Sequence, residues 1–142
     1  MKKLQLTNNL WLHEYVDKET YLYYEKMNKL HKLAYKLDNK LIKSDQLLRE
    51  FFGRVIINNW NEGGSRNWSG LRNINSQYYK KDSLHTEFKA SDKIFENATP
   101  KEVQDYILIT WKELGISAIE LDKSWTHTDT RFIPFQKQLF TF

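Results

Sequence analysis

The sequence predicts an α+β fold, a single domain with N-terminal helices packed on a small, mainly antiparallel sheet. The chain has 142 residues, a length that fits one domain with its own hydrophobic core. Residues 1–52 repeat leucines at helical spacing, whereas residues 53–142 contain short β-branched segments and one strongly punctuated helix. This order, helices first and then a small sheet with one inserted helix, indicates the α+β class.

The N-terminal part, residues 1–52, is predicted to be helical after a short lead-in. The lead-in leaves room for a brief helical turn around residues 10–15, and the helical pattern starts at Glu19. One apolar stripe then recurs at spacings of 3, 4 and 4, formed by Leu30, Leu33, Leu37 and Leu41. A break is expected near residues 38–39, and the segment SDQLLREFFG predicts a helix that ends at Gly53.

A row of lysines follows the leucine stripe one position earlier: Lys29, Lys32, Lys36 and Lys40. Such a row is typical of the solvated flank of a helix, and a strip that binds cell wall or nucleic acid is the alternative. The formal net charge of +4 and the pI of about 9.1 favour an anionic partner or serve solubility alone.

The C-terminal part, residues 53–142, is predicted to form the sheet. Residues 55–59 and 90–95 are expected to be strands, and residues 117–121 and 125–131 a hairpin joined at 122–124. The intervening loop of more than twenty residues is rich in Gly, Asn and Ser, and loops of this length are usually functional. Thr99, Pro100 and Glu102 provide the start of a helix that ends at Gly115. The apolar tail FIPFQKQLFTF is expected to dock on the rest.

The composition excludes several kinds of chemistry. The chain has no cysteine, so disulfides, thiolate metal sites and a cysteine nucleophile are excluded, and a transition metal would need imidazole and carboxylate ligands. The N-terminus is basic but lacks the apolar run and cleavage site of a signal peptide. No window approaches the length of a membrane span, so a substrate outside the cytoplasm would require another route of delivery.

Two histidines and two aspartates are candidate metal-site residues. His85, Asp92 and His127 provide the two imidazoles and one carboxylate of many catalytic zinc sites, in which water takes the fourth position. The three converge if the strand that begins near Asp92 neighbours the strand of His127. Alternation along WTHTDTR puts Asp129 on the same face as His127, where it would orient this ligand. The alternative is a pair of surface or hydrogen-bonded histidines.

Three separated motifs resemble one enzyme family. SLHTEFKASD is similar to the S-x-H-x-x-x-x-A-x-D signature of the D-Ala-D-Ala carboxypeptidase family of zinc metallopeptidases, which includes phage endolysins. WTHTDTR resembles their second motif in the form of the phage-associated branch. INNWNEGG followed by SGLR resembles a segment of that branch that leads to a functional arginine. The resemblance covers roughly residues 55–131.

The resemblance implies one hedgehog/D-Ala-D-Ala peptidase-like domain over residues 1–142, which binds zinc and hydrolyses peptide bonds in bacterial peptidoglycan stem peptides. His85, Asp92 and His127 match the zinc ligands. Arg72 matches an arginine that faces the substrate near the scissile bond, and Ser83 would contact substrate or loop backbone. Aromatic residues of the long loop would line the substrate groove: Trp60, Trp68, Tyr78 and Tyr79.

Two positions depart from the family pattern. Phe88 occupies a position that is often glycine, which would reshape the ligand loop. Ser124 occupies the position of an acidic residue that serves many of these enzymes as the general base. Glu120 on the preceding strand is the favoured replacement, and Asp129 is the alternative. A zinc-binding cell-wall or phage structural module without hydrolysis is therefore the alternative function. No nucleic acid is expected as a partner, because no recognised motif for it is present.

Overall fold

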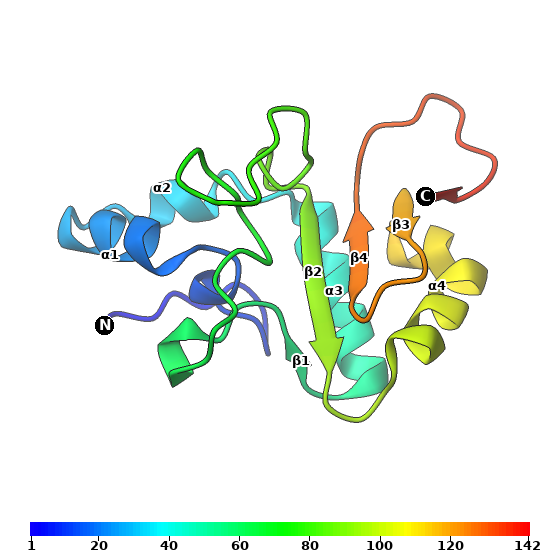
Figure 1. Ribbon diagram of the computed structural model, residues 1–142, viewed down its shortest axis with the longest axis horizontal. Coiled ribbons are helices and arrows are strands. Elements are labelled where there is room, and N and C mark those ends of the chain that lie inside the picture. Colours follow the sequence, from blue (N-terminus) through cyan, green and yellow to red (C-terminus); the bar gives the residue numbers. More distant parts are fainter.

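A five-stranded sheet forms the centre of the fold, with the strand order β1-β2-β4-β3-β5 (Figure 1). The computed structural model describes all residues, 1–142. The strands are β1 (Val55–Ile56), β2 (Ala90–Phe95), β3 (Ala118–Glu120), β4 (Thr126–Asp129) and β5 (Phe140–Thr141). Neighbouring strands are antiparallel except β3 and β5, which run parallel. The predicted α+β class with a mainly antiparallel sheet is confirmed.

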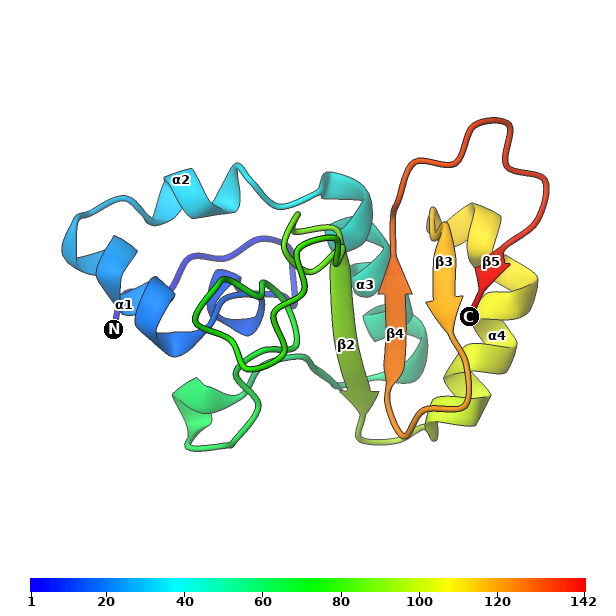
Figure 2. The same cartoon turned by 45° about the horizontal axis from the view of Figure 1, so that its top comes forward.

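Helices cover one face of this sheet and continue to one side of it. α3 (Asn39–Phe52) and α4 (Pro100–Leu114) pack behind β2 and β4, as Figures 1 and 2 show. α1 (Lys18–Lys26) and α2 (Leu30–Ala34) lie beside the sheet, and two short 3₁₀ helices span Leu12–Glu14 and Trp60–Glu62. No helix combines the length and the apolar character that a bilayer crossing requires.

One apolar core joins the two parts of the chain. It contains 21 buried residues, which include the whole leucine stripe of the N-terminal part. The C-terminal part contributes Phe88 from the long loop, Val103 and Ile107 from α4, and Ile119 from β3. Because both parts bury their apolar side chains in the same cluster, they form one domain.

The N-terminal helices are more fragmented than the leucine periodicity predicts. The expected break near residues 38–39 is present, and the Asp38 carboxylate caps α3 by accepting the Lys40 backbone N–H at 2.9 Å. A second break follows α1, where Asn28 has a φ of 55°. This left-handed conformation cannot continue a right-handed helix. α3 ends at Gly53, as predicted.

The C-terminal elements match the predictions except at two places. The capping box of α4 joins Thr99 and Glu102, β2 spans the predicted residues, and the β3–β4 hairpin is present. β1 is shorter than predicted, because only two of its residues pair with β2. The tail docks as predicted only at its C-terminal end, where Leu139 packs on the core and the Phe142 N–H donates to the Ile119 carbonyl at 3.2 Å. β5 offers only two residues to β3, and Phe132 and Phe135 are 85% and 97% exposed.

A buried ion pair fixes α3 to the back of the sheet. Lys93 of β2 and Asp45 of α3 are fully buried, with their Nζ and Oδ1 atoms 3.0 Å apart. The Lys93 ammonium also donates to the Thr128 hydroxyl of β4 at 2.6 Å. Because side chains alternate along a strand, Lys93 and Thr128 face the helices while Asp92 and His127 face the opposite side. This cluster therefore determines which face of the sheet presents the candidate ligands.

Candidate metal centre

The strand register places three candidate residues in one row. Asp92 of β2 and Glu120 of β3 both pair directly with His127 of the central strand β4. Side chains of directly paired residues lie on the same face with adjacent Cβ atoms. The row therefore sits on the face of the sheet that α3 and α4 leave open. The long loop before β2 brings His85 over this row.

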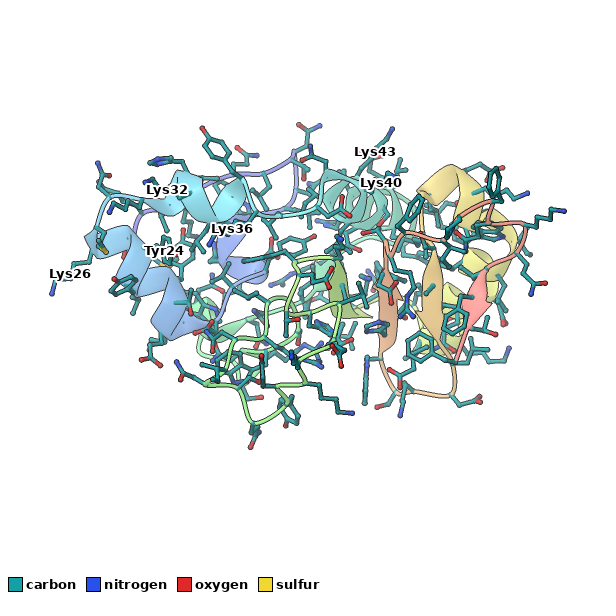
Figure 3. The ribbon with its side chains drawn as sticks, turned by 90° about the horizontal axis from the view of Figure 1, so that it is seen from above. Tyr24, Lys26, Lys32, Lys36, Lys40 and Lys43 are labelled. Carbon is teal, nitrogen blue, oxygen red and sulfur yellow. The ribbon has the colours of Figure 1, made fainter.

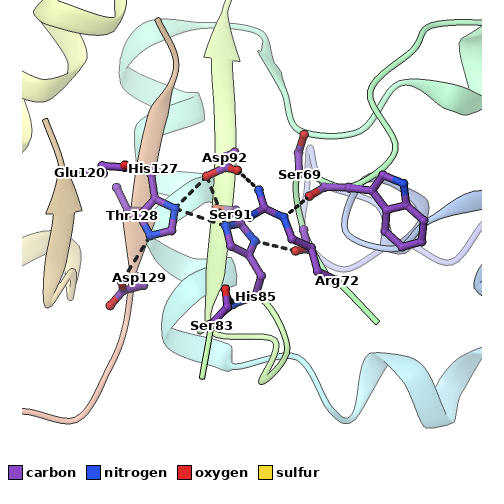
Figure 4. A network of polar contacts seen from close by, with 12 residues as sticks. Ser69, Arg72, Ser83, His85, Ser91, Asp92, Glu120, His127, Thr128 and Asp129 are labelled. Atoms are coloured by element: carbon purple, nitrogen blue, oxygen red, sulfur yellow. Dashed lines mark hydrogen bonds and ion pairs between the residues drawn. The ribbon is translucent and has the colours of Figure 1, made fainter. Parts of the chain in front are cut away.

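The ligand atoms of His85, Asp92 and His127 converge (Figure 4). His127 Nδ1 lies 2.7 Å from Asp92 Oδ1. His85 Nε2 lies 3.3 Å from Asp92 Oδ1 and 3.3 Å from His127 Nδ1. Ligands bound tetrahedrally to zinc at about 2.0–2.1 Å are about 3.3 Å apart. All three residues are at most 7% exposed, so only a small part of each lines the groove described below.

In each histidine, the ring nitrogen that points away from Asp92, here called the outer nitrogen, lies beside a hydrogen-bond acceptor. His85 Nδ1 lies 2.7 Å from the Gly70 carbonyl oxygen, and His127 Nε2 lies 3.3 Å from Asp129 Oδ2. A backbone carbonyl only accepts hydrogen bonds, so His85 Nδ1 carries a proton, whereas His127 has a carboxylate beside each of its ring nitrogens. His85 Nε2 and His127 Nδ1 both face the Asp92 carboxylate. This arrangement favours positive charge beside the carboxylate, as a metal ion or as a proton on an imidazole.

The ionisation of the three residues follows from this crowding. Burial alone would raise the pKa of Asp92, but hydrogen bonds from His127 and His85 and their positive charge hold it well below its usual range. Burial lowers the pKa of His85. Burial also opposes charge on His127, yet its hydrogen bonds to Asp129 and Asp92 raise its pKa overall. The centre is therefore an anionic carboxylate that attracts positive charge.

A glycine sets the position of the loop that anchors His85. A Cβ atom at Gly70 would lie 2.3 Å from the Tyr15 carbonyl oxygen, so only glycine fits against this backbone. The next residue, Leu71, donates its N–H to the same Tyr15 oxygen at 2.7 Å. On the other side of the loop, the Asp92 N–H donates to the Ser69 carbonyl at 2.7 Å. The loop is thus attached both to the N-terminal part and to a ligand strand.

Arg72 contacts the candidate ligand Asp92. Its guanidinium forms an ion pair with Asp92 Oδ2, the oxygen that does not face the histidines. Its Nε donates to the Trp68 carbonyl at 2.8 Å, and the guanidinium lies 5.7 Å from the centre of the Tyr78 ring. The Arg72 side chain is 19% exposed, so it also reaches the surface of the groove beside the centre.

Asp129 is committed to its neighbours. Its carboxylate accepts hydrogen bonds from Arg131 Nε at 2.8 Å and from Arg131 Nη2 at 2.5 Å, and it also contacts His127 Nε2. Burial would raise the pKa of Asp129, but the hydrogen bonds from Arg131 and His127 lower it to about 2. An acid this strong accepts a proton poorly near neutral pH. The geometry therefore suits Asp129 to orienting His127.

Glu120 remains available at the groove surface. It is the cross-strand neighbour of His127, and its side chain is 26% exposed with one ion pair, to Lys123 at 3.3 Å. Ser124, by contrast, is exposed in the β3–β4 turn and does not line the groove. Of the two carboxylates considered as base, only Glu120 combines access to the centre with a weakly engaged carboxylate.

Two adjoining pockets form a groove across the centre. The first has a volume of about 560 Å³ and contains the candidate ligands with Glu120 and Asp129 on its walls. Its cationic residues are Arg72, Lys80, Lys81 and Arg131. The second has a volume of about 510 Å³, is lined by Trp68, Tyr78 and Trp125, and shares Arg72 and Asp92 with the first. The two pockets therefore meet at Arg72 and Asp92, beside the candidate centre.

The remaining predicted substrate residues are placed differently. The Ser83 hydroxyl lines the first pocket and accepts the His85 backbone N–H at 3.3 Å, so it shapes the ligand loop. Trp60 packs against Tyr21, with its indole N–H on the Val16 carbonyl at 2.9 Å, and lines neither pocket. Tyr79 also lies outside both pockets. The structure does not bring these two aromatic residues to the centre.

Several residues of the centre have no clear signal in the sequence. Gly70 precedes Arg72 by two residues in SGLR, but its role depends on the distant Tyr15 backbone. Phe142 lies edge-on to His127, with ring centroids 5.7 Å apart, and the Arg131 guanidinium lies 5.2 Å from its centre. For Arg131, the sequence offers one signal: alternation along WTHTDTR places its side chain on the same face as His127.

Comparison with protein-family models, with curated proteins and with solved structures gives no match to this chain. What the centre can do is inferred from its residues and their arrangement.

Proposed function

We propose that the protein is a zinc-dependent metallopeptidase that hydrolyses peptide bonds in bacterial peptidoglycan stem peptides. The observation that carries this proposal is the convergence of His85 Nε2, Asp92 Oδ1 and His127 Nδ1, with both outer imidazole nitrogens held by acceptors. The ordered motifs that resemble the D-Ala-D-Ala carboxypeptidase family supply the reaction and the substrate class.

Zinc fits this donor set better than other common metals. Two imidazoles and one carboxylate, with no thiolate in the chain, are the protein ligands of many catalytic zinc sites. Calcium and magnesium favour all-oxygen surroundings, which two histidines do not provide. When bound, zinc supplies a Lewis acid that polarises a carbonyl group and increases the acidity of water.

The protein's own groups would divide the remaining work. Glu120 would accept the proton of the attacking water and return it to the leaving amine. Arg72 would hold Asp92 in place and present its exposed edge to a substrate carbonyl or carboxylate. Asp129 would keep the proton on His127 Nε2, so that Nδ1 remains a ligand atom.

The backbone at Phe88 supports the resemblance despite the changed residue. Phe88 has a φ of 57°, in the left-handed region that favours glycine, the residue often found there in the family. Its side chain is 7% exposed within the core, and this burial offsets the backbone strain. The loop can thus keep a conformation that suits glycine while it carries a bulky apolar residue.

The alternative function is a zinc-binding cell-wall or phage structural module without hydrolysis. The observation that favours it is Ser124, which leaves the groove without an acid at the family position. Glu120 is also tied to Lys123, and this ion pair would have to open before the carboxylate could move a proton.

Zinc-loaded protein incubated with purified peptidoglycan decides between the two. We expect new free amino groups with the wild type and their loss in Glu120→Gln, while zinc content stays unchanged. Glu113→Gln, on the exposed side of α4, is the matched control and should keep full activity. A wild type that binds zinc and releases no amino groups would support the structural module. A wild type that binds no zinc would refute both.

A further inference from the structure

Six lysines lie between the end of α1 and the middle of α3 and are here called the lysine ridge: Lys26, Lys29, Lys32, Lys36, Lys40 and Lys43, all but Lys29 labelled in Figure 3. All are exposed except Lys29, which is half-buried. Residues 26–43 contain these six lysines and one acidic residue, so their net charge of +5 exceeds the +4 of the whole chain. The excess positive charge of the protein is therefore concentrated on this surface.

The charges of the lysine ridge have no partner within the protein. None of its ammonium groups takes part in an ion pair. The carboxylate of the single acidic residue, Asp38, does not pair with a lysine ammonium. It accepts hydrogen bonds from the Lys40 backbone N–H at 2.9 Å and from the Thr130 hydroxyl at 2.5 Å. Lys40 and Lys43 are also neighbours on α3, where like charges repel. An external anion would relieve this repulsion.

The core holds the leucine side of the segment that carries the ridge, while Met27 and Tyr35 are exposed among the lysines. The stripe beneath it is buried in the core: Leu30, Leu33, Leu37 and Leu41. The helices therefore cannot rotate their lysines away or insert leucines into a bilayer, which an interfacial membrane helix would do. The lysines extend over three successive helices in Figure 3, which suits a linear polyanion more than a compact ligand.

The positive charges of the ridge are all lysines, which suit contacts to phosphate groups. The ridge contains no arginine, although the protein has five elsewhere. Arginine provides the planar fork that reads base edges, whereas lysine acts as a flexible point charge. The charges are also spread over three helices and the segments between them, rather than gathered on one recognition helix that could enter a duplex groove.

The ridge adjoins the loop that carries the metal centre. The Asp38 N–H donates to the Phe88 carbonyl at 3.2 Å, and the Thr130 N–H donates to the Lys89 carbonyl at 3.0 Å. Phe88 follows His85 by three residues, and Thr130 follows Asp129 directly. A polymer bound along the ridge would therefore run past the same loop that positions the candidate zinc ligand.

We propose that the lysine ridge binds a linear alditol-phosphate polymer of the bacterial wall, a polyanion of the teichoic acid type. The choice of a wall polymer rests on the proposed function, because it would hold the protein beside its peptidoglycan substrate. The binding itself depends only on the spacing and charge of the lysines.

The test is the binding of full-length, zinc-loaded protein to purified glycerol-phosphate teichoic acid, measured between about 50 and 200 mM salt. One variant combines Lys32→Gln, Lys36→Gln and Lys40→Gln. The matched control combines three exposed lysines outside the ridge: Lys101→Gln, Lys112→Gln and Lys137→Gln. Both sets lower the formal net charge from +4 to +1, so only the position of the lost charge differs.

We expect the ridge variant to bind at least about tenfold more weakly. The slope of its log affinity against log salt concentration should fall by about two, since each lost phosphate contact lowers this slope by about 0.7. The control should bind as the wild type does. Equal losses in both variants, or no binding by the wild type, would overturn the proposal. Tighter wild-type binding to duplex DNA than to teichoic acid would replace the wall polymer with nucleic acid.

Hydrolysis of a soluble stem peptide by the same three proteins separates this proposal from the proposed function. The ridge lysines do not line the groove, so all three should cleave the peptide equally. A complete lack of cleavage would refute the peptidase and leave the result on polymer binding intact.

Discussion

Replacement of Gly70 by alanine tests how the structure holds His85. The new Cβ would lie 2.3 Å from the Tyr15 carbonyl oxygen and 2.7 Å from two further backbone atoms of Tyr15. Ordinary contact begins at 3.4 Å, so the loop must move by about 1 Å, because backbone atoms on both sides cannot yield as a flexible side chain would.

This shift breaks the hydrogen bond that orients the ligand. The bond from His85 Nδ1 to the Gly70 carbonyl is 2.7 Å long, and a further 1 Å or so takes it beyond the usual limit of about 3.2 Å. Loss of such an outer contact typically costs about 10- to 100-fold in metal affinity. We therefore expect Gly70→Ala to weaken zinc binding by about 1.4–2.7 kcal/mol.

Competition with a chromogenic chelator measures this affinity. Gly63→Ala is the control, because Gly63 has a φ of 84°, where alanine is strained, but no atom lies within 4 Å of its new Cβ. This variant should lose some stability and keep its zinc affinity. If Gly70→Ala bound zinc as tightly as Gly63→Ala, the Gly70 carbonyl would not be what holds His85.

Three further changes probe the fold and the centre. Lys93→Met leaves the Asp45 charge buried without its partner and should cost about 3–5 kcal/mol in urea unfolding, and an unchanged midpoint would contradict the buried ion pair. Asp129→Asn removes the charged acceptor of the His127 outer nitrogen and should weaken zinc binding about 10- to 100-fold by chelator competition, whereas unaltered affinity would show that it does not orient the ligand. Burial raises the pKa of Glu14 from 4.5 to about 7, so the folded state favours its protonated form. Stability should therefore fall by about 1–3 kcal/mol as the pH rises from about 4.5 through 7. Glu14→Gln should flatten this part of the urea stability profile, and an identical profile would refute the assignment.

The sequence predicts the composition of the centre well because strand alternation is a local property. WTHTDTR places His127 and Asp129 on one face, and the structure has both on the face that the helices leave open. The capping signals at Thr99 and Gly115 are equally local, and α4 begins and ends as they predict.

Contacts between distant segments are less accessible to sequence reasoning. The partner of Lys93 is Asp45, on a helix 48 residues earlier, and neither residue belongs to a recognisable pattern. Trp60 shows the reverse case, because an indole in a polar loop suggests a groove wall. Here the ring packs beside Tyr21, where its N–H finds a buried carbonyl. Burial, not loop composition, determines where this side chain lies.

Zinc K-edge X-ray absorption on the zinc-loaded protein tests the central claim most directly. The account predicts two imidazoles and further oxygen ligands at about 2.0–2.1 Å, with no sulfur. The variant His85→Ala/His127→Ala should retain no specifically bound zinc. A wild type that takes up no zinc, or whose zinc has no imidazole ligand, would contradict the centre formed by His85, Asp92 and His127.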